Sequence, residues 1–153
     1  MRTFELKREQ TFGRPIEEVF AFFAAAENLE RITPPWLRFR IVSPLPIEMQ
    51  VGARIDYRLR LHGLPIGWQS EITAWEPPYR FVDEQRRGPY QLWVHEHRFR
   101  SDGERTHVVD HVTYAVPGGS IVRDLFVRGE LERIFAYRYA VLEREVFPSG
   151  LHV

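Results

Sequence analysis

Hydrophobic and polar residues alternate along most of the chain up to position 114. The alternation is nearly ideal at 54–62, where Ile55, Tyr57, Leu59 and Leu61 are separated by charged residues. A period of two residues predicts a β-strand with one face toward a core and the other toward water. Turns rich in glycine and proline separate such segments. The predicted strands are 2–12, 36–42, 54–62, 68–74, 80–85, 91–99 and 106–114.

The period becomes helical in two regions. Between positions 15 and 32, apolar residues at helical spacing predict two short helices, and the spaced residues of the first are Ile16, Val19, Phe20, Phe23 and Ala24. After Pro117 and two glycines, Ile121–Phe147 predicts one helix about 40 Å long. One stripe of this helix carries Leu131, Ile134, Arg138 and Val141, and beside it lie Leu125, Arg128, Phe135, Tyr139 and Leu142.

This order of elements predicts an α+β fold. Short turns make consecutive strands antiparallel neighbours, so the strands form one sheet of about seven. A sheet of that size curls, and a long helix with a broad apolar face fills its concave side. The chain shows no repeats, linkers or low-complexity tracts, so residues 1–153 are expected to form a single domain.

The strands at 91–99 and 106–114 predict a β-hairpin around Asp102 and Gly103, because Asp-Gly is a strong signal for a two-residue loop. If these two residues form the loop, the register brings ten residues to one face. The predicted pairs are Phe99 with Thr106, His97 with Val108, His95 with Asp110, Trp93 with Val112 and Gln91 with Tyr114.

That face mixes large aromatic residues with two histidines and an aspartate. Burying polar groups costs free energy unless they are hydrogen-bonded, so a face used only for packing rarely keeps them. We interpret the face as the polar floor of a cavity. A satisfied polar cluster beneath the long helix is the simpler alternative. Arg138, on the apolar stripe, either extends to the surface along its aliphatic stem, reaches Asp83 or Asp110, or holds a ligand carboxylate.

A metal site is a further alternative, because His95 and His97 face the same way on one strand and Asp110 offers a third ligand. We find no fourth ligand, and Asp110 more simply orients His95, so no metal is expected. No cofactor motif is present either.

The amino-acid composition restricts the partners and the cellular location that the chain is expected to have. The 21 basic and 21 acidic residues cancel, so bulk charge favours neither nucleic acid nor an anionic membrane as a partner. The absence of cysteine excludes disulfides and thiolate metal sites, and is consistent with a cytoplasmic location. No stretch is long and apolar enough to span a membrane, and the N-terminus lacks the apolar run of a signal peptide.

Three motifs carry a resemblance to a known family: Arg80–Gln85 followed by Gly88-Pro89-Tyr90, the strand Trp93-x-His95-x-His97-x-Phe99, and Arg128-x-x-Leu131-x-x-Ile134-Phe135-x-Tyr137-Arg138. With the order of elements, the chain resembles the helix-grip fold of the START/Bet v 1 (SRPBCC) superfamily, and most closely a bacterial group of ligand-binding or polyketide cyclase/dehydrase-like proteins. The resemblance covers nearly the whole chain and implies a ligand cavity without specifying the ligand.

We therefore expect a small hydrophobic or aromatic ligand between the sheet and the last helix. The candidate ligand-binding residues are Tyr57, Trp68, Phe81, Asp83, Gln85, Trp93, His95, His97, Asp110, Tyr114 and Arg138. The alternative is a cyclase or dehydratase in which His95 is the general base and Asp110 fixes its tautomer. A protein-interaction role has no support from an exposed apolar segment.

Overall fold

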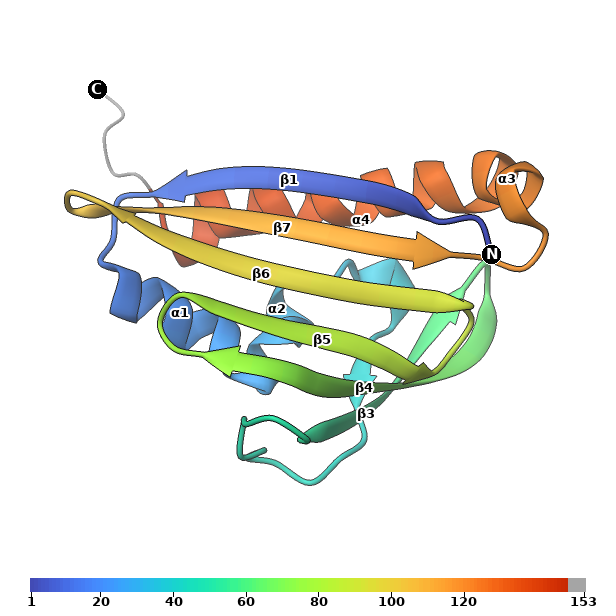
Figure 1. Cartoon of the computed structure of the whole chain (residues 1–153), viewed down its shortest axis with the longest axis horizontal. Coiled ribbons are helices and arrows are strands. Elements are labelled where there is room, and N and C mark those ends of the chain that lie inside the picture. The colour runs from blue at the N-terminus through green and yellow to red at the C-terminus, as the bar shows by residue number, and fades with distance from the viewer. Residues whose placement is uncertain (149–153) are drawn as a thin grey trace.

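The computed structural model describes residues 1–148 and shows a curved antiparallel sheet with a long helix on its concave side (Figure 1). The strands are ordered β1-β7-β6-β5-β4-β3-β2. Their bounds are β1 Phe4–Phe12, β2 Arg40–Ile41, β3 Arg54–Leu61, β4 Leu64–Glu76, β5 Arg80–Arg87, β6 Leu92–Asp102 and β7 Arg105–Ala115. The predicted α+β helix-grip fold is confirmed.

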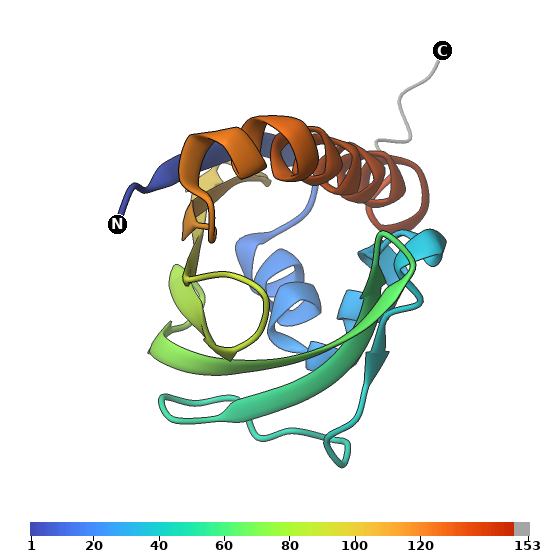
Figure 2. The same ribbon diagram turned by 90° about the vertical axis from the view of Figure 1, so that its right-hand side faces the viewer.

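The helices occupy two places. The segments α1 Ile16–Ala24, η1 Ala26–Asn28, α2 Leu29–Ile32 and η2 Pro35–Leu37 follow β1. After β7 the chain forms α3 Gly119–Val122, η3 Arg123–Val127, α4 Arg128–Val141 and η4 Leu142–Val146. Seen end-on, the sheet curls round an interior that α4 closes along its open side (Figure 2). No helix within residues 1–148 is long and apolar enough to span a membrane.

The core has two parts, both on the concave face. A phenylalanine cluster lies under α1 and comprises Phe12, Phe20, Phe23, Phe81, Phe99 and Phe147. A second group gathers under the start of α4, and its buried members are Phe4, Val112, Tyr114, Val116, Leu131 and Phe135. Other side chains line the middle of the space between the sheet and α4.

The hairpin register differs from the prediction by two residues. Gly103 and Glu104, rather than Asp102 and Gly103, form the loop, so Asp102 pairs with Arg105. Gly103 adopts a φ of +64°, which glycine reaches without strain at the first loop position. The observed pairs are Phe99 with Val108, His97 with Asp110, His95 with Val112 and Trp93 with Tyr114, while Gln91 lies just before β6. Because the shift is even, every one of these strand residues keeps its predicted face.

Two other predicted elements are altered. The strand expected at 36–42 is reduced to β2, because Pro35 starts a short 3₁₀ turn and Arg38 adopts a left-handed φ of 46°. The long C-terminal helix contains wider π-type turns at η3 and η4. The predicted stripe is buried or half-buried, whereas three of the residues expected beside it are exposed: Leu125, at 70%, Arg128 and Tyr139.

Candidate functional site: a cavity with a polar wall

A cavity of about 180 Å³ lies between the concave face of the sheet and α4. Most of its lining is apolar and comes from the short helices, β3 and α4, including Phe22, Phe23, Leu37, Phe39, Leu59, Leu61, Leu131, Ile134 and Phe135. The polar lining residues are Asn28, Thr33, Tyr57, Ser70, Asp83, His95, His97 and Arg138. Apolar walls with a few convergent polar groups are typical of small-molecule sites.

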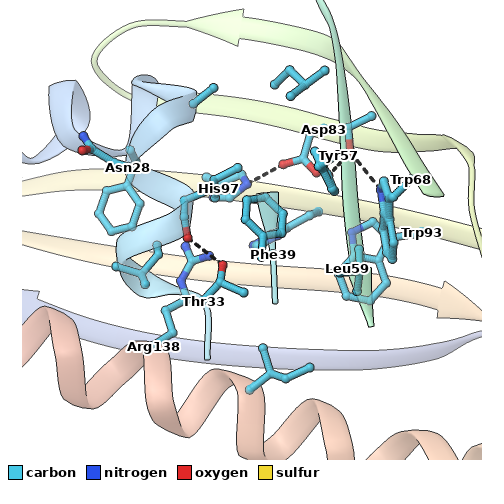
Figure 3. A pocket seen from close by; sticks show the side chains of 18 of the residues that line it. Asn28, Thr33, Phe39, Tyr57, Leu59, Trp68, Asp83, Trp93, His97 and Arg138 are labelled. Atoms are coloured by element: carbon cyan, nitrogen blue, oxygen red, sulfur yellow. Dashed lines mark hydrogen bonds and ion pairs between the residues drawn. The ribbon is translucent and has the colours of Figure 1, made fainter. Parts of the chain in front are cut away.

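Two histidines form the centre of the polar wall. His95 and His97 alternate along β6 onto the concave face, and their rings stack with centroids 3.7 Å apart. The sheet register places Asp83 opposite His95 and Asp110 opposite His97. The hydrogen bonds run diagonally instead. His97 Nε2 lies 2.7 Å from Asp83 Oδ2 (Figure 3), and His95 Nε2 lies 2.8 Å from Asp110 Oδ1. The contact predicted between His95 and Asp110 is present.

Arg138 reaches into this cluster from α4. Its Nη2 donates to Asp110 Oδ1 at 3.1 Å, and the guanidinium lies over the rings of Phe23 and Phe135. The side chain is 9% exposed, so it does not extend to the surface. We call Asp83, His95, His97, Asp110 and Arg138 the polar cluster. Arg138 links its sheet residues to the helix.

Both carboxyl groups of the polar cluster are held ionised. Burial alone would raise the pKa of Asp110, but the positive charge of Arg138, the hydrogen bond from His95 and the nearby His97 lower it well below its usual value. Burial likewise opposes ionisation of Asp83, but the hydrogen bond from His97 and the interactions with His95, His97 and Arg138 together outweigh it, so the pKa of Asp83 is lowered. Each carboxylate is therefore only an acceptor.

The surroundings shift the pKa values of the two histidines in opposite directions. Burial, reinforced by the neighbouring His97, lowers the pKa of His95 despite its bond to Asp110. Burial also acts against the charged form of His97, but its contacts with Asp110 and Asp83 outweigh this and raise its pKa. His97 Nδ1 lies 3.4 Å from Asp110 Oδ1, an ion-pair contact longer than a normal hydrogen bond.

The ionised carboxylate of Asp110 fixes the tautomer of His95. Because Asp110 is ionised, His95 Nε2 must carry the proton that joins them, and a neutral imidazole then has a lone pair on Nδ1. Within residues 1–148 neither His95 Nδ1 nor Asp83 Oδ1 has a hydrogen-bond partner, and both residues line the cavity. The sheet wall thus offers two acceptors for a ligand.

A second polar group lies on β3 and β4. Ser70 Oγ accepts a hydrogen bond from Trp68 Nε1 at 3.0 Å and shares a short one with the Tyr57 hydroxyl. Burial, together with the negative charge of Asp83, raises the pKa of Tyr57, so its phenol stays protonated. Trp68 also meets Trp93 edge-to-face, with centroids 5.4 Å apart. This side of the cavity is therefore aromatic, and its polar groups are paired with one another.

Eight of the eleven candidate residues line the cavity: Tyr57, Trp68, Phe81, Asp83, Trp93, His95, His97 and Arg138. The other three lie outside it. Gln85 binds the backbone N–H and C=O of Tyr90 and so shapes the loop between β5 and β6. Tyr114 is buried, and its hydroxyl accepts a hydrogen bond from Arg123 Nε at 3.3 Å. Asp110 lies behind the histidines and supports them.

Several lining residues were not among the candidates. Ser70 occupies the predicted inward face two positions from Trp68, so alternation provided the signal. Tyr90 and Phe39 lie in segments without regular structure, where periodicity gives no orientation. Thr33, Asn28 and Phe22 reach the cavity only because the short helices close against the sheet.

The polar cluster also contains a possible metal-ligand set. One atom each of Asp83, His95 and His97 lie within 4.8 Å of one another, so Asp83 takes the place that the sequence had assigned to Asp110. A divalent ion at these atoms would have to displace the proton between His97 and Asp83. The hydrogen bonds of the cluster account for its geometry without a metal ion.

Comparison with known proteins identifies relatives at the level of family and fold. The family model described as "Polyketide cyclase / dehydrase and lipid transport" matches residues 12–135. No curated protein matches the sequence.

Solved structures show the same fold at low sequence identity. Protein Ms6760 from Mycobacterium smegmatis superposes with a TM-score of 0.66 at 19% identity, covering 92% of this chain and 91% of that one. The Zhui aromatase/cyclase from Streptomyces sp. R1128 superposes with a TM-score of 0.70 at 18% identity, and the match covers 97% of this chain and 99% of that one. Major latex-like protein 151 from Panax ginseng superposes with a TM-score of 0.70 at 15% identity, and the match covers 95% of this chain and 99% of that one.

Proposed function

The chain belongs to the polyketide cyclase/dehydrase and lipid transport family, and from this membership and the cavity we propose that it binds a small hydrophobic or aromatic molecule. The ligand lies between the curved sheet and α4, with its apolar body on the aromatic walls. Its polar end meets the polar cluster, where Asp83, His95, His97 and Arg138 line the space. Asp110 acts behind them by orienting His95 and Arg138.

The observation that carries this proposal is the coexistence of an open apolar cavity with a polar cluster whose inward atoms lack partners. A packed core fills its interior with side chains and leaves few spaces larger than a water molecule. Here about 180 Å³ remains beside His95. A cavity of roughly 150 Å³ admits a benzene molecule, so the space suits a ligand of one or two rings.

A second function has support from one specific feature, the free Nδ1 of neutral His95. In a cyclase or dehydratase, this atom would take a proton from an acidic C–H of the bound substrate and return it to the hydroxyl that leaves as water. Asp110 would stabilise the imidazolium formed in between, as in other His–Asp pairs. Binding needs no such step, so we place it first.

Native mass spectrometry of freshly purified protein tests binding directly, with a co-purified small molecule as the expected result. Tryptophan fluorescence then screens flavonoids, fatty acids and aromatic polyketides, because Trp68 and Trp93 line the cavity. We expect quenching by at least one class. No bound molecule and no quenching by any class would contradict the proposal.

Substitution of His95 separates a structural role from a binding role. His95→Ala leaves Asp110 without one of its donors and costs roughly 1–3 kcal/mol of stability in either case. If His95 orients the ligand, His95→Ala weakens binding, and His95→Gln weakens it less because the glutamine amide keeps both a donor for Asp110 and an acceptor for the ligand. Unchanged affinity in a folded His95→Ala protein assigns His95 to structure alone. Loss of turnover of a bound polyketide in this variant would favour the enzyme.

A further inference from the structure

The guanidinium of Arg138 has more hydrogen-bonding capacity than the protein uses. An arginine carries five N–H donors. Within residues 1–148 Arg138 makes one hydrogen bond, from Nη2 to Asp110 Oδ1, and its enclosed Nε has no partner. The single oxygen that receives this bond also faces His95 and His97, so Arg138 shares its one acceptor with both histidines.

The surroundings make this unused capacity costly. Arg138 is buried, lies over the rings of Phe23 and Phe135, and lines the cavity. A buried cation that lacks hydrogen-bond partners is destabilising unless another group supplies them. A carboxylate matches the planar fork of a guanidinium and accepts two hydrogen bonds from it.

The sheet wall has the opposite chemistry. His95 Nδ1 and Asp83 Oδ1 are both acceptors without partners in the part of the chain that the structure describes. In Figure 3 Arg138 extends from the helix, whereas Asp83 and His97 extend from the sheet toward the same space. The polar end of a ligand therefore meets a donor wall on one side and an acceptor wall on the other.

We propose that the ligand is a hydroxylated aromatic carboxylic acid, held with its carboxylate on Arg138 and its hydroxyl directed to His95 and Asp83. This inference rests on the proposed binding function and defines its ligand class. The hydroxyl donates to an acceptor that otherwise has no partner, and the carboxylate supplies the oxygens that Arg138 lacks. The apolar ring fills the space between the walls.

One-ring probes of matched size test the carboxylate. Calorimetry compares benzoate with benzamide, which has the same shape without the charge. A hydrogen-bonded charge contributes enough that benzoate should bind wild type roughly tenfold more tightly than benzamide. In Arg138→Met this ratio should fall to about one while the affinity for benzamide changes little, because the apolar walls remain. Arg133→Met, at an exposed position of the same helix, should keep the wild-type ratio.

A second set of variants keeps the test valid if Arg138→Met does not fold. Arg138→Lys retains a charge beside Asp110 but lacks the planar fork, so the preference for benzoate should shrink without vanishing. Asp83→Asn removes a negative charge from the opposite wall, so benzoate should bind more tightly while benzamide is little affected. A preference that is unchanged in both variants would overturn the role of Arg138.

The hydroxyl is tested with the three isomers of hydroxybenzoate. We expect at least one isomer to bind several-fold more tightly than benzoate, and His95→Ala to remove that gain. Equal binding of benzoate and benzamide by the wild type would overturn the proposal that the ligand is a carboxylic acid, and would leave the proposed binding function intact. Failure of every one-ring probe also overturns it, and the wider fluorescence panel then decides whether the cavity binds ligands at all.

Discussion

The inner face of β6 has two halves of opposite chemistry. Toward its hairpin end, Phe99 lies against Phe20 and Phe23, with ring centroids 5.0 and 5.6 Å apart. Two and four residues earlier, His97 and His95 occupy the same face and join the polar cluster. One strand therefore contributes to a filled aromatic core at one end and to a charged cavity wall in its middle.

The difference shows how stability and binding are divided in this protein. Aromatic rings in contact at the closed end bury apolar surface, the main stabilising term in folding. Buried charges in the middle add little net stability, because desolvation offsets their attraction. A protein that needs only a core gains nothing from the second arrangement, so the polar half is the part that ligand binding explains.

Substitution in the aromatic half should have the largest effect. Phe99→Ala empties the centre of the phenylalanine cluster and should cost about 3–5 kcal/mol, as buried phenylalanine truncations do. Chemical denaturation monitored by circular dichroism measures the loss. A loss below that caused by substitutions in the polar half would show that the aromatic half is not the main source of stability.

Removing one charge from the polar half should lower the free energy of unfolding by less than Phe99→Ala does. Asp110→Asn keeps the size of the side chain but takes the counter-charge from Arg138 and leaves His95 a neutral amide oxygen in place of a charged acceptor. Hydrogen bonds to charged groups are worth roughly 1.5–3 kcal/mol, which sets the expected loss at neutral pH. Denaturation at neutral pH measures the loss.

The pH dependence of this variant gives a sharper test. The pKa of Asp110 is lower in the folded protein than in the unfolded chain, so its contribution is complete above an unfolded value of about 3.9 and is lost as the pH falls through the folded value. Stability of wild type should therefore fall on acidification below about pH 5. Asp110→Asn should show a shallower fall, so the two curves converge in acid. Parallel curves would show that Asp110 is not held ionised.

The smallest effect is expected on the convex face. Arg54 forms an exposed ion pair with Glu71 at 3.0 Å. Such pairs contribute about 0.2–1 kcal/mol and weaken with salt. Arg54→Ala should lie in that range in dilute buffer and approach zero in high salt. A larger or salt-independent loss would show that the convex face is more than a solvated surface.

The alternation of residues determined which side chains of the central strands face inward. A strand has only two faces, so the pattern alone placed His95, His97, Asp110 and Trp93 together, and a two-residue error in register left them there. The same argument placed Tyr57, Trp68 and Phe81 on the concave face. Helical spacing and the Pro117-Gly-Gly break located the last helix to within a few residues.

Tertiary structure decided how these residues meet. The pairing of each histidine with its diagonal aspartate depends on sheet twist and on a loop whose position differs by one residue from the Asp-Gly signal. The orientation of Arg138 depends on which face of α4 meets the sheet, and the sequence pattern permitted burial and exposure equally. Whether the concave space is filled or open follows from how closely α4 and the short helices approach the sheet. The spacing of residues along the chain contains no information on that distance, so only the tertiary structure shows the cavity.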